Sequence, residues 1–150
     1  MVEWIDPIEA LQAAFPDAVQ DTQEFRGEIT GVIDGAQIVE VCRYCRETKG
    51  LEYNFLSDVT GIDYYPQEPR FGVAYHLYSM THNRSLRLKV LLPGDEPSVP
   101  SVTSVYPAAN WSERWLPMIR SVMRCVYLQV ATAARWVTSR LRAAASRALV

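Results

Sequence analysis

The chain has 150 residues, enough for one ordinary domain, and its 49% hydrophobic and 21% charged residues exclude a disordered or collagen-like protein. The net charge of −2 argues against nucleic acid as the main partner. That sum hides an asymmetry, because all 17 acidic residues lie in 1–114, whereas 115–150 contain six arginines and neither lysine nor an acidic residue. The sequence therefore predicts a domain over 1–114 with a net charge of −8 and a separate basic tail over 115–150 with a net charge of +6.

The first 33 residues predict a helix followed by two short strands. Asp6 can cap a helix that starts at Pro7 and ends before Pro16. Two short strands are then predicted over about 18–25 and 28–33, on either side of a tight turn at Arg26 and Gly27. A helix and a hairpin are therefore expected at the start of the domain.

A second helix is predicted over about 35–48. Arg43 and Glu47 are spaced to form an ion pair on its exposed side, and Gly50 suits the C-terminal cap. Its apolar stripe consists of Ile38, Val41, Cys42 and Cys45.

The remainder of the domain predicts three strands and a short helix. A strand over about 54–65 has a break at Gly61, and a long hairpin follows over 71–92. A proline-rich linker over 93–100 leads to a short helical turn and to a helix over 108–114. Because hairpins replace repeating βα units, the order predicts an α+β fold with helices packed on a mixed or antiparallel sheet. The basic tail is predicted to be helical.

One pattern has the residue types of a metal or redox site. Cys42 and Cys45 form a Cys-x-x-Cys motif, but a four-ligand site lacks a second such pair, and Cys125 is the remaining cysteine. Both residues also fall on the apolar stripe of the second helix, where cysteine acts as a small hydrophobic residue. The sequence favours this structural role.

Asp58, Asp63 and His76 are the residues that could support acid–base chemistry. Paired carboxylates can move protons or hold a metal, but Asp beside Thr and Gly is also ordinary in turns. His76 and His82 have no nucleophile and acid placed beside them by the sequence pattern. An enzyme built on these residues is the weakest of the functions considered.

No targeting or membrane-spanning segment is expected. The N-terminus lacks the basic and apolar regions of a signal peptide, and there is no run of about 18 apolar residues. Three cysteines are too few, and an odd number, for a disulfide framework. These features predict a soluble protein of a reducing compartment, with peripheral membrane association left open.

Five segments occur in the order found in one protein family. They include Glu24-Phe-Arg-Gly-Glu28 and Asn54-Phe-Leu-Ser-Asp-Val-Thr-Gly-Ile-Asp-Tyr64, and they continue through 75–83, 86–90 and 99–114. Over about residues 9–114 the protein therefore resembles the 30 kDa subunit, also called the C subunit, of proton-pumping NADH:quinone oxidoreductase, respiratory complex I.

The resemblance implies an accessory and assembly subunit of the peripheral arm. Such a subunit lies beside the large quinone-site subunit and supports electron transfer from NADH to quinone without a redox centre of its own. It implies no catalytic, cofactor-binding or metal-binding residue in this chain, with FMN and iron–sulfur clusters held by partner subunits. It also implies a peripheral, indirect attachment to the cytoplasmic side of a bacterial inner membrane, with no nucleic acid as partner.

The residues expected to contact the partner lie at the end of the resemblance. An aromatic residue close to an arginine is typical of an interface. The alternative is that Trp111 belongs to the core and that an exposed pair of Glu113 and Arg114 contributes less than about 1 kcal/mol. The candidate set is Tyr106, Asn110, Trp111, Glu113 and Arg114.

The resemblance ends at Arg114, because Trp115 and Met118 stand where the family pattern has acidic residues. Two explanations for 115–150 stay open. The abrupt loss of acidic residues, and arginine without lysine, favour a segment substituted by a shifted reading frame. The other explanation is an amphipathic helix, and it leads to the alternative function: a standalone protein whose basic tail binds anionic lipid or nucleic acid.

Overall fold

The computed structural model describes residues 3–95 and 97–115, and the predicted helical tail therefore lies outside the described residues. The order of helices and strands in the described part is the predicted one. The elements are α1 (Pro7–Ala14), β1 (Val19–Phe25), β2 (Glu28–Ile33), the 3-10 turn η1 (Gly35–Gln37), α2 (Ile38–Glu47), β3 (Phe55–Asp63), β4 (Phe71–Ser79), β5 (Arg84–Leu92) and α3 (Ala109–Trp115).

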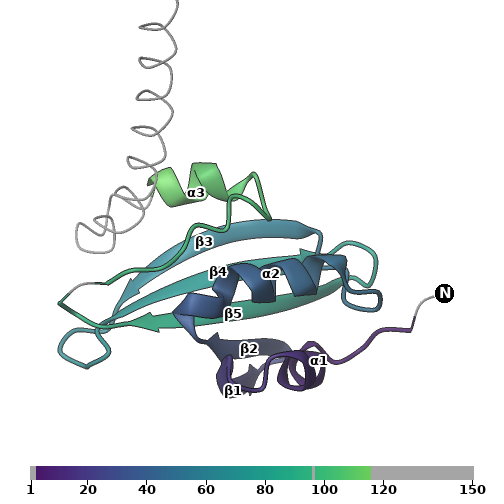
Figure 1. The fold of residues 1–150 in the computed structure, drawn as a ribbon, viewed down its shortest axis with the longest axis horizontal. Coiled ribbons are helices and arrows are strands. Elements are labelled where there is room, and N and C mark those ends of the chain that lie inside the picture. Colours follow the sequence, from purple (N-terminus) through teal and green to yellow (C-terminus); the bar gives the residue numbers. More distant parts are fainter. Residues whose placement is uncertain (1–2, 96, 116–150) are drawn as a thin grey trace, which may run out of the picture.

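The five strands form one mixed sheet in the order β1-β2-β5-β4-β3 (Figure 1). Three neighbouring pairs are antiparallel, and β2 pairs with β5 in parallel. A parallel pair needs a long connection, which α2 and the β3–β4 pair provide. The predicted α+β fold, with helices packed on a mixed or antiparallel sheet, is confirmed.

The three helices share one face of the sheet, and Figure 1 shows α2 lying across its middle. Side chains of α1, α2 and α3 join alternate residues of β4 and β5 in one buried cluster. In β5 the buried residues alternate with half-buried ones, so Arg87 and Lys89 point to the opposite face, as predicted. The centre of the cluster includes Leu11, Val41, Cys45, Tyr75, Leu88, Val90 and Ala109.

Helix α1 begins as predicted, because the Asp6 carboxylate accepts hydrogen bonds from the backbone N–H groups of Ile8 (2.8 Å) and Glu9 (3.2 Å). Leu11 lies on the side of α1 that faces the sheet and is fully buried. A Cβ atom at Gly31 would lie only 3.1 Å from Cδ1 of Ile8, so the small residue lets α1 pack closely on β2.

Helix α2 has the predicted apolar stripe, and all four of its residues are buried. The predicted ion pair of Arg43 with Glu47 is wrong, since Arg43 instead pairs with Glu40 at 2.7 Å. Residues three and four positions apart are both within reach on a helix, and spacing alone does not choose between them. The pair is exposed and therefore contributes little to stability.

The predicted break at Gly61 is also wrong, because Gly61 pairs in register with Val73. The irregularity of β3 lies between Leu56 and Asp58 instead. There the Asp58 carboxylate accepts a hydrogen bond from the backbone N–H of Val59 (2.8 Å), which stabilises a local bulge. The bulge places Leu56 and Val59 in the core and leaves Asp58 exposed.

None of the helices in the described ranges is long and apolar enough to cross a membrane.

Candidate functional site

Helix α3 contains most of the predicted partner residues and lies beside β3 (Figure 1). Ala109 is fully buried and belongs to the core cluster. Glu113, one helical turn later, is also buried, with 4% of its surface exposed. Trp111 is 68% exposed, so the alternative that Trp111 is part of the core is wrong. The helix therefore turns its glutamate inward and its tryptophan outward.

The buried Glu113 carboxylate fastens α3 to the segment before it. Its Oε2 atom accepts hydrogen bonds from the hydroxyls of Ser101 (2.7 Å) and Thr103 (3.2 Å). Its Oε1 atom accepts one from the backbone N–H of Val102 (3.1 Å). Hydrogen bonds to a charged acceptor are stronger than neutral ones, and a buried charge needs such donors. Glu113 thus positions the helix that presents Trp111.

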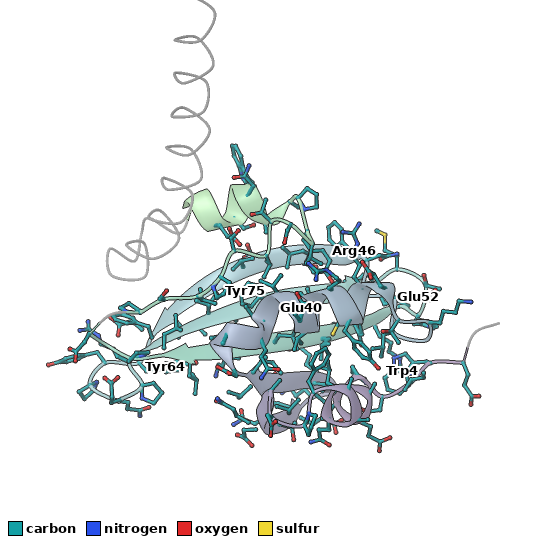
Figure 2. The ribbon with its side chains drawn as sticks, in the orientation of Figure 1. Trp4, Glu40, Arg46, Glu52, Tyr64 and Tyr75 are labelled. Atoms are coloured by element: carbon teal, nitrogen blue, oxygen red, sulfur yellow. The ribbon has the colours of Figure 1, made fainter. Side chains whose placement is uncertain are left out.

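Tyr106, which lies between Thr103 and α3, is held in place by contacts with Tyr53 and with Arg46 of α2. Its hydroxyl donates to the backbone carbonyl of Tyr53 (2.6 Å), and the Arg46 guanidinium lies 5.7 Å from the centre of its ring. Arg46 projects from α2 toward this segment and also donates to the carbonyl of Val105 (Figure 2). Burial raises the pKa of Tyr106, so the phenol stays protonated.

The structure therefore divides the five predicted partner residues. Asn110 and Trp111 lie on the surface, where a partner can touch them. Tyr106 and Glu113 are buried, with contacts inside the domain, and the side chain of Arg114 lies outside the described residues. Partner contact stays a prediction for this set. Ser101 and Thr103 were not predicted, because no sequence rule links a Ser-x-Thr pair to a glutamate ten residues on.

Cys42 and Cys45 lie inside the core, where both are fully buried. Burial raises the pKa of the Cys42 thiol to about 12 and raises that of Cys45 well above its usual value. A thiol that stays protonated is a poor nucleophile and a poor metal ligand. Among the described residues there is no group of three or more His, Cys, Asp or Glu that could hold a metal ion.

We predict that neither core thiol reacts with Ellman's reagent at pH 8 in the folded protein. Replacing Cys125 with serine leaves Cys42 and Cys45 as the remaining cysteines. In this variant, the native protein should release almost no chromophore within an hour, and guanidinium should expose both thiols at once. Rapid reaction of either thiol in the native state would show that the apolar side of α2 is accessible to the reagent, contrary to the prediction.

The three residues considered for acid–base chemistry are not brought together. His76 pairs across the sheet with Asp58, whereas Asp63 pairs with Phe71 near the other end of β3. Five residues along a strand separate the two carboxylates by about 17 Å. Asp63 is instead bound by Arg70 through two hydrogen bonds of 3.0 and 2.9 Å, which lowers the pKa of the Asp63 carboxyl.

A hollow of about 380 Å³ lies over the strands around His76. Its walls come from β2, β3, β4 and β5, on the side of the sheet opposite the helices. The Glu28 carboxylate accepts a hydrogen bond from the Arg87 guanidinium at 2.5 Å within it. The residues that line it are Glu28, Ile29, Ser57, Asp58, His76, Leu77, Tyr78, Ser85, Leu86 and Arg87. We call this the open-face hollow.

The pKa of His76 is lowered, chiefly by burial and then by the nearby Arg87 guanidinium. The folded protein therefore prefers neutral His76, while the unfolded chain takes up a proton at its usual pKa of about 6.5. We predict that this residue lowers the free energy of unfolding as the pH falls from 7 toward 5. In His76→Gln, urea denaturation should show a smaller loss over this range, and an unchanged loss would contradict the assignment.

Two solved structures share this α+β fold. A structure described as the trypsin-resistant fragment (1–134) of Nqo5 is 24% identical and superposes with a TM-score of 0.61, covering 73% of this chain and 88% of that one. A protein of the membrane-bound sulfane sulfur reductase, an archaeal respiratory membrane complex, is 22% identical with a TM-score of 0.60, covering 71% of this chain and 61% of that one. The described domain thus has the fold of these two proteins.

Sequence comparison defines the family. The model of the respiratory-chain NADH dehydrogenase 30 kDa subunit matches residues 32–116. The C subunit of NADH-quinone oxidoreductase from Roseiflexus sp. strain RS-1 is 44% identical over 107 residues, which are 71% of this chain and 62% of that protein. The C 2 subunit of the same enzyme from Rhizobium etli strain CIAT 652 is 44% identical over 104 residues, which are 69% and 55% of the two proteins.

The chain belongs to the respiratory-chain NADH dehydrogenase 30 kDa subunit family. The resemblance inferred from the five sequence segments is thereby confirmed. The chain spans less than two thirds of the length of these relatives. The family match ends at residue 116, close to the point at which the acidic domain gives way to the basic tail.

Proposed function

We propose that the chain is an accessory and assembly subunit in the peripheral arm of a proton-translocating NADH:quinone oxidoreductase. The match of residues 32–116 to the family model carries this proposal. The subunit supports electron transfer from NADH to quinone without a redox centre of its own. The burial of both described cysteines supports this division of labour, because their thiols are protected from ligands and oxidants.

The partner that we propose is the large quinone-site subunit, together with other subunits of the peripheral arm. FMN and iron–sulfur clusters would be held by those subunits. The chain would lie at the cytoplasmic side of a bacterial inner membrane and attach to it through its partners. A net charge of −8 over 1–114 suits such a role, since charge steers association and fixes orientation.

Co-purification from the source organism tests the proposal. An affinity tag is placed at the N-terminus of the 150-residue chain, and the eluate is assayed for the large quinone-site subunit, flavin and iron–sulfur signals. We expect all three to elute with the tagged protein at physiological salt. If it elutes alone although it is folded by circular dichroism, the proposed function is wrong.

A version that ends at Trp115 separates the domain from the tail. It keeps α3, which ends at that residue. We expect the truncated version to retain the partner subunits, because the family match and α3 end within one residue of each other. In the alternative function, salt-sensitive binding to anionic vesicles or DNA would be lost with residues 116–150, and no oxidoreductase subunit would elute with either version.

A further inference from the structure

In the described residues, no helix covers the face of the sheet opposite α1, α2 and α3, which we call the open face. The register of the strands identifies its side chains: Arg87 of β5 pairs with His76 of β4, and His76 pairs with Asp58 of β3. Thr30 of β2 pairs with the same Arg87. Polar groups from four strands thus form one row, and this row crosses the open-face hollow.

Exposed aromatic side chains flank the hollow at the two edges of the sheet. Phe25 ends β1 and is 69% exposed, and Phe55 begins β3 and is 45% exposed. Their partners in the ladder are Glu28 and Tyr78, both of which line the hollow. Four strand spacings separate the two rings by about 19 Å. An apolar contact therefore lies on each side of a polar centre.

The Phe25 ring is exposed but has a cation–π contact with the neighbouring arginine. The Arg26 guanidinium lies 5.1 Å from the centre of the Phe25 ring, at the tip of the β1–β2 hairpin. Arg26 and Gly27 both have positive φ angles, of 54° and 79°, which fix the tight turn behind the ring. The pair therefore presents an apolar ring and an arginine together at the hairpin tip, and arginine and aromatic side chains are enriched at interfaces.

The charge of the hollow indicates what it can bind. Glu28 and Asp58 contribute two negative charges, and Arg87 contributes one positive charge that Glu28 already pairs at 2.5 Å. Since His76 is neutral near pH 7, the hollow has a net charge of −1. The domain around it is acidic as well. Phosphate-bearing partners are disfavoured by this charge, whereas a lysine or arginine side chain is attracted.

We propose that this end of the open face is a docking surface for a partner subunit of the same enzyme complex. The partner inserts a lysine or arginine side chain beside Asp58 in the open-face hollow and places apolar side chains against Phe25 and Phe55. The inference rests on the proposed function, and it adds to it a defined surface and the chemistry of the partner side chain that binds there.

Two single substitutions test the surface in the full-length protein. Asp58→Asn removes one charge, while its amide oxygen can still accept the hydrogen bond from Val59. Asp21→Asn is the matched control, because Asp21 also follows a strand irregularity and accepts a hydrogen bond of 2.8 Å from the next residue, but lies outside the hollow. Phe25→Ser removes an aromatic anchor. Its control, Tyr65→Ser, removes a side chain that is 74% exposed and lies outside the hollow.

The measurement is the ratio of co-purified partner subunits to tagged protein after washes at 0.15 and 0.5 M salt. At 0.15 M salt we expect Asp58→Asn to lower the ratio at least fivefold and Phe25→Ser about tenfold, with the two controls within twofold of wild type. The deficit of Asp58→Asn relative to wild type should shrink at 0.5 M salt, since salt screens the charge.

Three results would overturn the inference. If Asp58→Asn and Phe25→Ser each behave like their controls, the partners dock elsewhere and the proposed function stands. If light scattering shows that the wild-type protein is a dimer and that Phe25→Ser is a monomer, the surface binds a second copy of this protein instead of another subunit. If the wild-type protein retains no partner subunit, the proposed function fails and the partner named here fails with it.

Discussion

Replacing Glu113 with alanine is expected to lower the free energy of unfolding by about 3 kcal/mol. The change removes a buried carboxylate that accepts three hydrogen bonds, from Ser101, Val102 and Thr103. The N–H of Val102, which is fully buried, and two half-buried hydroxyls would lose their acceptor. Urea denaturation followed by circular dichroism measures the loss.

Glu113→Gln is the control for this prediction. The amide oxygen can still accept from the N–H of Val102, and the hydroxyls of Ser101 and Thr103 can rotate to accept from the amide N–H₂ group. We therefore expect a loss of about 1–2 kcal/mol, smaller than that of the alanine variant. An alanine variant as stable as wild type would show that the three hydrogen bonds do not hold α3 in solution.

Replacing Leu88 with alanine is expected to lower the free energy of unfolding by about 4 kcal/mol. Leu88 lies on β5, the central strand of the sheet, and is fully buried. It pairs with Gly31 on one side and Tyr75 on the other, beneath α1 and α2. Because Gly31 has no side chain to move into the space, the cavity would stay open and the loss would lie toward the upper end of the usual range.

The control for Leu88 lies on the same strand. Leu91 is half-buried and points to the open face, so Leu91→Ala removes the same atoms without a closed cavity. We expect a loss of about 1 kcal/mol for that variant. Equal losses for the two variants would mean that the helices do not seal their face of the sheet.

The fold could be predicted largely because its signals are local. In β5, Leu86, Leu88, Val90 and Leu92 alternate with other residues, and this period fixes which side of the strand is buried. Asp6 before Pro7 marks the start of α1 for a similar reason, since the cap is formed by neighbours in the sequence. The parallel pairing of β2 with β5 had no local signal, because it joins residues more than fifty positions apart.

The candidate site was harder to predict, because its buried and exposed residues are the reverse of what their residue types suggest. Glutamate is rarely buried and tryptophan often is, yet Glu113 is 4% exposed and Trp111 is 68% exposed. The reason is tertiary: a hydroxyl pair and a backbone N–H from 101–103 surround the Glu113 carboxylate. The open-face hollow had no sequence signal either, since its residues come from four strands.

The central claim is that the 150-residue protein is an accessory subunit whose domain binds the large quinone-site subunit. Native mass spectrometry of a mixture of the two proteins tests this claim most directly. We predict a one-to-one complex that contains no cofactor mass contributed by the 150-residue protein. The complex should survive removal of residues 116–150. A folded protein that stays free in the spectrum, at micromolar concentration of both proteins, would contradict the proposed role.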